Sequence, residues 1–189
     1  FLPYILESDR KPLPEYLETY KVSNPIIFSH NDIKNIDMGH GIISSSGFDI
    51  NEIEENSRIF INGHLHNGGQ ITDKVINLGN LTGNGFGEDA FTYKHNVMIL
   101  DTATLTYELV ENPYAFKFYK IDFTKKNSHK YINEVANSIG NNAVVSIACK
   151  EDDAEDIRMK FDPNYHSKSP DSVKGVLYSR IQVIRNMVS

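Results

Sequence analysis

Residues 58–66 read Arg58-Ile59-Phe60-Ile61-Asn62-Gly63-His64-Leu65-His66. The centre of the run 58–62, Ile59-Phe60-Ile61, is apolar and consists of β-branched and aromatic side chains, which is typical of a buried strand. Two histidines one residue apart in an extended chain point to opposite faces. Because Gly63 frees the backbone at the strand end, both imidazoles can instead turn toward one centre. The alternative is a pair of ordinary hydrogen-bonded histidines, so the interpretation depends on the rest of the sequence.

A second apolar run also delivers a histidine at its end. Residues 24–29 are Asn24-Pro25-Ile26-Ile27-Phe28-Ser29, and His30 follows them. The proline is tolerated at the start of a strand, where its missing donor matters least. Ligands to a metal ion usually come from several strands and loops, and open α/β sheets bind ligands at the carboxyl ends of their strands. The two runs together therefore predict a metal site at one edge of a sheet.

These segments resemble known motifs. Residues 28–30 and 61–66 resemble the last two metal motifs of the calcineurin-like metallophosphoesterases. Residues 75–82, Val75-Ile76-Asn77-Leu78-Gly79-Asn80-Leu81-Thr82, resemble the strand and loop that follow the Gly-His-x-His motif in SbcD-type nucleases, including phage recombination endonuclease subunits. The likeness extends over nearly the whole chain, although its motifs are confined to residues 28–82.

The resemblance implies a two-metal phosphodiesterase centre. His30 and His64 would bind one divalent ion and His66 the other, and a metal-activated hydroxide would attack the phosphodiester. The resemblance favours Mn²⁺, while imidazole ligands leave Fe²⁺ and Zn²⁺ open. The candidate cleft residues beside these ligands are Asn31, His40 and Asn67.

The other histidines are less informative. His40 lies between two glycines, so it is either a cleft residue or a surface loop histidine, and we favour the surface. The polar surroundings of His95, His129 and His166 also predict surface positions.

Three earlier motifs of the family, Asp-x-His, Gly-Asp-x-x-Asp and Gly-Asn-His, do not occur in these 189 residues. We therefore expect the chain to be the C-terminal part of a longer nuclease, to bind metal weakly and to be inactive alone. The implied partners are DNA and an SbcC-like SMC-family ATPase, with homodimerisation as a further expectation. Two alternatives stay open: a metallophosphoesterase for small phosphoesters or phosphoproteins, and a non-catalytic partner-binding fragment.

The periodicities predict an α/β (α+β) chain in two parts. The resemblance implies that residues 1–113 form the C-terminal half of a metallophosphoesterase β-sandwich flanked by helices, and residues 114–189 a small α+β capping domain that contacts DNA and controls its access. Strands are expected at 2–6, 24–29, 58–63, 74–78, 96–101, 104–111, 116–123, 143–149 and 176–184, with a hairpin turn at 102–103. Helices are expected at 12–21, 49–56, 128–139 and 152–161.

Composition limits the protein class. Hydrophobic content of 40% and charged content of 23% are ordinary for a globular domain. We find no apolar segment of membrane-spanning length and no signal-peptide pattern, so we expect a cytoplasmic protein without membrane contact. The single cysteine, Cys149, lies in an apolar run and reads as a buried strand residue.

The net charge of −6 is unfavourable for a DNA enzyme, because DNA affinity depends on Lys and Arg that neutralise phosphates. A missing part or a partner could supply the basic groove. The nearest basic group is better explained as a solvated linker and helix face; its members are Lys117, Lys120, Lys125, Lys126 and Lys130.

Overall fold

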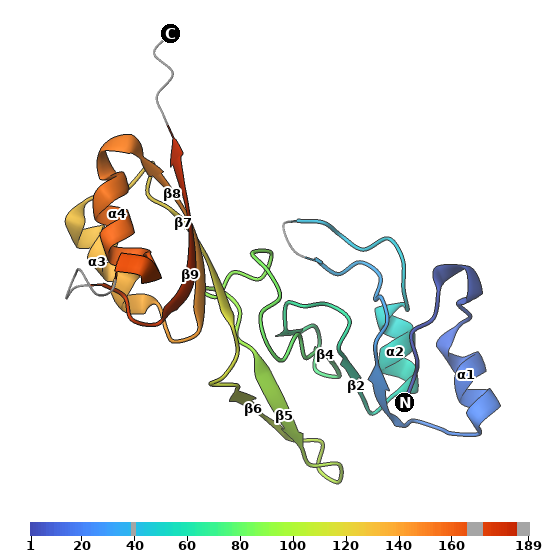
Figure 1. Cartoon of the computed structure of the whole chain (residues 1–189). Helices are drawn as coiled ribbons and strands as arrows, with labels where there is room; N and C mark the ends of the chain where they lie inside the picture. Colours follow the sequence, from blue (N-terminus) through green and yellow to red (C-terminus); the bar gives the residue numbers. More distant parts are fainter. Residues whose placement is uncertain (39–40, 166–171, 185–189) are drawn as a thin grey trace. The chain divides into compact units, whose positions relative to one another are not determined.

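The computed structural model describes residues 1–38, 41–165 and 172–184 (Figure 1). Contacts within the chain define two units. The first consists of Phe1–Leu81 and Lys94–Asn112, and the second of Thr82–Tyr93 and Pro113–Ser189. The described residues form four α-helices and three sheets, which agrees with the α+β class. None of these helices has the length and apolar character needed to span a membrane.

The first unit is built on a four-stranded sheet. Its strand order is β1-β2-β4-β3, in which β1 (Ile26–Ser29), β2 (Ile59–Asn62) and β4 (Val75–Asn77) are parallel. The two-residue strand β3 (Gly69–Gln70) is antiparallel to β4. All residues of β2 and β4 are buried. Their carboxyl ends therefore open on the same edge, as the sequence predicts for the histidine-bearing loops.

Both faces of this sheet are covered within the first unit. Phe60 packs with residues of α1 (Leu13–Tyr20) and α2 (Ile50–Asn56), including Leu13 and Ile53. Ile59 and Ile61 point the other way and pack against the hairpin of β5 (Asn96–Leu100) and β6 (Tyr107–Glu111). Burial on both faces explains why residues 59–61 form a continuous apolar run.

The second unit contains a three-stranded parallel sheet of order β7-β8-β9. Its strands are β7 (Lys117–Asp122), β8 (Ala143–Lys150) and β9 (Val176–Ile184). The helices α3 (His129–Ser138) and α4 (Ala154–Phe161) lie on one face, where Ile157 and Phe161 are fully buried. Cys149 is also buried in this core, and its burial raises the pKa of the thiol.

Most predicted elements are confirmed, but the strand predicted at 2–6 is wrong. Leu2 forms only an isolated bridge with Ser29, and a 3₁₀ turn, η1 (Glu7–Asp9), follows. Pro3 lacks a backbone donor, and the Ile5 N–H donates to the side chain of Asn31 at 2.8 Å instead of to a strand. The other short 3₁₀ turns are η2 (Glu151–Asp153) and η3 (Pro163–Tyr165).

The hairpin turn is longer than predicted. The backbone N–H groups of Ala103 and Thr104 donate to the Asp101 carboxylate at 2.8 and 3.1 Å. The bond from the Thr104 N–H is the main cause that lowers the pKa of Asp101, and the bond from Ala103 lowers it further. They close a loop after Asp101, and the second strand of the hairpin, β6, therefore begins only at Tyr107.

Glu52 joins the two helices of the first unit. The Leu13 N–H at the start of α1 donates to the Glu52 carboxylate on α2 at 2.8 Å. Burial raises the pKa of Glu52, and the Leu13 bond opposes this only in part. The folded chain therefore holds this proton at a pH where the unfolded chain releases it.

We expect Glu52→Gln to reduce the pH dependence of stability. Because the folded pKa is raised, stability is fully present below the unfolded pKa and declines as the pH rises through the folded pKa. The amide oxygen of glutamine still accepts from Leu13 but does not titrate. Thermal denaturation from about pH 4 to about pH 7 should show a smaller decline than in the wild type. Glu55→Gln on the exposed side of α2 is the control; equal slopes in all three proteins would contradict the prediction.

Candidate functional site

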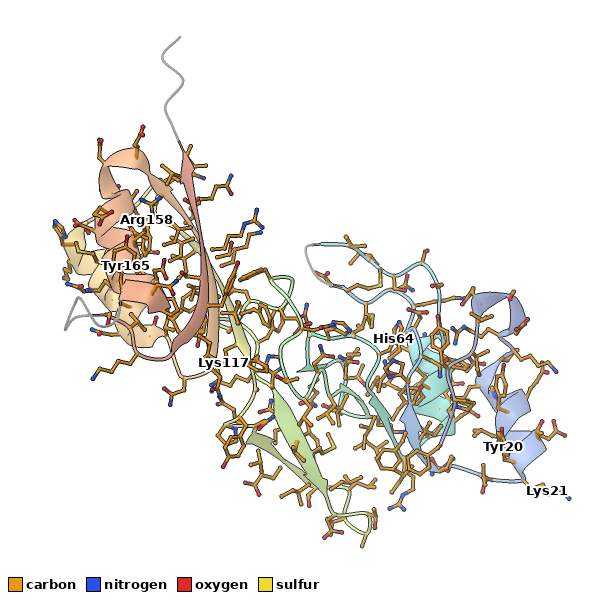
Figure 2. The ribbon with its side chains drawn as sticks, in the orientation of Figure 1. Tyr20, Lys21, His64, Lys117, Arg158 and Tyr165 are labelled. Carbon is orange, nitrogen blue, oxygen red and sulfur yellow. The ribbon has the colours of Figure 1, made fainter. Side chains whose placement is uncertain are left out.

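The parallel strands bring two of the predicted ligands together. His30 follows β1 and His64 follows β2 by two residues, and the Gly63 N–H donates to the Ser29 carbonyl at 3.0 Å. The two imidazole rings lie with their centroids 5.1 Å apart and nearly perpendicular, at 87°. His64 is labelled in Figure 2. Residues more than thirty positions apart thus meet at the strand ends, as the sequence predicts.

The ring of His64 is fixed on two sides. Its Nε2 lies 3.0 Å from the Asp32 carboxylate, and the ring of Tyr4 stacks on it with centroids 5.6 Å apart. Its Nδ1 is buried, yet it has no hydrogen-bond partner among the described residues. When Nε2–H donates to Asp32, the neutral ring leaves the Nδ1 lone pair available. A carboxylate behind an imidazole is the usual arrangement of a metal-ligating histidine.

Charged groups continue behind Asp32. The Arg10 guanidinium lies 4.0 Å from the second Asp32 oxygen and donates to Glu7 at 2.8 Å. The Arg10 side chain is only 7% exposed and lies over the ring of Phe48, 4.7 Å from its centroid. The hydrogen bond from Arg10 is the main cause that lowers the pKa of Glu7. The sequence alone did not identify any of these groups.

Three buried asparagines hold the loops that carry the histidines. The Asn62 side chain accepts from the Asn31 N–H at 3.0 Å and donates to the Asn31 carbonyl at 2.9 Å. It also donates to the Asn77 side chain at 3.3 Å. Asn77 in turn donates to the carbonyls of Leu65 and Asn67 at 2.7 and 2.9 Å. The amides therefore connect the ends of β1, β2 and β4 and set the path of the backbone around His64.

The remaining predicted residues lie in different environments. Asn31 is fully buried and its amide binds backbone groups, so it supports the loop rather than lining a cleft. Asn67 is half-buried, with a buried Oδ1 that has no partner among the described residues. His66 is exposed on the turn after His64. His40 and His166 lie outside the described residues.

In the described part of the chain, no group of three His, Cys, Asp or Glu side chains is arranged to hold a metal ion. His30 and His64 meet, but the exposed His66 does not complete a three-ligand group with them. The Nδ1 of His64, which has no partner among the described residues, still fits the role of a metal ligand. The Asp32 carboxylate on Nε2 is the support that a metal-ligating histidine usually has. The residues present are therefore consistent with part of a metal site.

His95 departs from the surface position predicted for it. It is only 4% exposed, and its Nδ1 lies 3.0 Å from the Asn80 carbonyl. Its Nε2 is buried without a partner among the described residues. The polar neighbours of His95 in the sequence were misleading, because its contact is with the loop after β4, fifteen positions away.

Comparison with protein-family models finds no match, and comparison with curated proteins finds none.

Proposed function

We propose that this chain contributes imidazole ligands to a metal-dependent phosphodiesterase, of the SbcD-like DNA nuclease type. The observation that carries the proposal is the state of His64: a carboxylate holds one ring nitrogen, and the other, beside His30, is buried with no partner in the described part of the chain. The motif resemblance of residues 28–30 and 61–66 supports the same assignment. DNA is the proposed substrate and an SMC-family ATPase the proposed partner.

Each residue has a distinct role in this proposal. His30 and His64 would hold one divalent ion, and His66 would bind a second. Bound divalent ions would polarise the phosphoryl group and lower the pKa of water. Asp32 would keep the His64 proton on Nε2 and so direct the Nδ1 lone pair toward the ion. Tyr4 would limit rotation of the ring by stacking on it.

Manganese binding to the 189-residue chain is the direct test. The upstream motifs of the family do not occur in this sequence, so binding rather than hydrolysis is measured, by calorimetry and by the EPR signal of free Mn²⁺. We expect His64→Ala to abolish site-specific binding. Asp32→Asn should weaken the affinity about 10- to 100-fold, because the amide no longer fixes the tautomer.

The matched control is His129→Ala, at an exposed position of α3 in the second unit, and it should bind like the wild type. If His64→Ala retained wild-type affinity, the proposed site would be wrong. If Asp32→Asn bound metal as tightly as the wild type, the role of Asp32 would be refuted while that of His64 could survive. Far-UV circular dichroism of each variant checks that it is folded.

A further inference from the structure

Arg10 is a buried cation to which the proposed function assigns no role. Its side chain is only 7% exposed, although Arg10 lies in the short connection between η1 and α1. The guanidinium lies over the ring of Phe48, 4.7 Å from the ring centroid. Burial of a charge costs free energy unless the groups around it compensate the loss of water. The partners of Arg10 therefore indicate what the buried charge does.

The guanidinium donates hydrogen bonds to groups before α1 and after β1. Its Nε donates to the Glu7 carboxylate at 2.8 Å, and its Nη2 donates to the Ile5 carbonyl at 2.9 Å. Its Nη1 donates to the side-chain oxygen of Asn31 at 3.4 Å. Because a guanidinium is planar and its donors point in fixed directions, these three acceptors set the orientation of the whole group.

In this orientation the cation lies behind the carboxylate that supports His64. The Nη2 of Arg10 lies 4.0 Å from one oxygen of Asp32, and the other oxygen lies 3.0 Å from the Nε2 of His64. At 4.0 Å the first contact is an ion pair without a direct hydrogen bond. The Asp32 carboxylate therefore has a fixed cation on one side and the imidazole on the other. Only 19% of the Asp32 side chain is exposed, so solvent screens this contact only in part.

A second connection runs from Arg10 to the backbone of Asp32. The Glu7 oxygen that accepts from Arg10 also accepts from the Gly47 N–H at 3.1 Å. Gly47 lies so close to the Asp32 carbonyl that a Cβ on the glycine would overlap it. Arg10 thus acts on Asp32 directly at the carboxylate and, through Glu7 and Gly47, at the main chain.

We propose that Arg10 is a positioning residue of the candidate metal site and acts through Asp32 on His64. The cation holds the Asp32 carboxylate where it accepts from the Nε2–H of His64. The imidazole is thereby kept in the tautomer whose lone pair is on Nδ1. The consequence for metal binding rests on the proposed function, whereas the tautomer is a property of the metal-free chain. A purely structural Arg10 would stabilise the loop through Ile5 and Phe48 without affecting the tautomer.

The tautomer of His64 can be measured in the metal-free 189-residue chain. Long-range proton–nitrogen NMR spectra distinguish a protonated from an unprotonated ring nitrogen, and a pH of about 8 keeps an ordinary imidazole neutral. The signals of His64 are those that His64→Ala removes from the spectrum of the seven histidines. We expect the wild type to carry the proton on Nε2 and Arg10→Gln to show both tautomers. The affinity of Arg10→Gln for Mn²⁺ should fall about ten-fold, the lower end of the effect of losing an outer-shell partner.

Three further variants separate charge, geometry and folding. Arg10→Lys keeps the charge but loses the planar fork, so its tautomer ratio and Mn²⁺ affinity should lie between those of the wild type and Arg10→Gln. Glu7→Ala changes a side chain that is half exposed and should shift the tautomer in the same direction as Arg10→Gln, even if the latter folds poorly. Arg58→Gln is the matched control. Arg58 is exposed and directly precedes β2, at the opposite end of this strand from His64, so the variant should behave like the wild type.

The tautomer and the metal affinity distinguish failure of this inference from failure of the proposed function. Wild-type tautomer and Mn²⁺ affinity in folded Arg10→Gln and Glu7→Ala would overturn the role of Arg10. The proposed function would still stand if His64→Ala abolished binding. A tautomer shift in Arg10→Gln, in a protein whose wild type binds no Mn²⁺, would instead support the action of Arg10 on His64 and refute the proposed function.

Discussion

Asn62→Leu is expected to destabilise the first unit by about 3–5 kcal/mol, because it removes hydrogen bonds without a compensating partner. Leucine has a similar volume but can neither accept from the Asn31 N–H nor donate to its carbonyl. Both groups are buried and would lose their partners, at about 1–3 kcal/mol each. Asn77 would lose a third bond. The variant should also lose manganese binding, since the same amides set the path of the backbone at His64.

Native-state hydrogen exchange can measure this effect unit by unit. The Leu78 amide donates to the Asn62 carbonyl at 2.7 Å, so its protection reports on the sheet at the substituted residue. Amides of β8 in the second unit serve as the internal reference. Asn51→Ala on the exposed start of α2 should change stability by no more than about 0.5 kcal/mol. A loss below about 1 kcal/mol for Asn62→Leu would show that the amide chain is not a major support.

Gly47→Ala is expected to lower the free energy of unfolding of the first unit by about 3–5 kcal/mol, because it combines backbone strain with atomic overlap. Gly47 has a φ of +113°, which side chains rarely adopt. A Cβ there would overlap the carbonyl carbon and oxygen of Asp32 and the nitrogen of Ile33. The Asp32 carbonyl also accepts from the Phe48 N–H at 3.0 Å. Relief of the overlap must therefore displace Asp32, and the imidazole of His64 loses its fixed partner.

Gly69→Ala provides the matched control for this substitution. Gly69 lies in β3, and nothing lies within 4 Å of a Cβ built on it. We expect a change of no more than about 0.5 kcal/mol and unaltered metal binding. Urea denaturation followed by circular dichroism gives the free energy of unfolding of both glycine variants. A Gly47→Ala protein as stable as the Gly69→Ala protein would mean that the loop accommodates a side chain beside Asp32.

The sequence predicts the scaffold of the site better than the site itself. The strands before His30 and His64 are apolar runs bounded by turn residues, and their parallel pairing places both histidines at one edge. The positions of these strands depend on the local pattern of apolar and turn residues, which can be read from the sequence. The partner of His64 depends on where the loop after β1 turns, and Asp32 differs from its neighbours by no periodic signal. An acidic residue two positions after His30 was the only available hint.

Other errors have the same origin in tertiary contacts. The strand predicted at 2–6 is wrong because the Asn31 amide takes the Ile5 N–H that a neighbouring strand would need. His95 is buried where its Nδ1 lies 3.0 Å from the carbonyl of Asn80, a residue fifteen positions away in the sequence. The register of the second sheet was equally hidden, since Lys120 and Arg180 are sixty residues apart in sequence and only the pairing of β7, β8 and β9 aligns them.

The chain passes from one unit to the other more than once, and this affects any attempt to divide the protein. Thr82–Tyr93 belongs to the second unit, although Lys94–Asn112 returns to the first. Within the second unit this segment lies along β7: Asp89 bridges Phe118, whose carbonyl accepts from the Ala90 N–H at 2.8 Å. A single cut at the boundary predicted after residue 113 would remove that cover and expose the outer edge of β7, although its other edge would still pair with β8. Unpaired strand edges recruit other chains, so the excised piece would tend to aggregate even though its own core were intact.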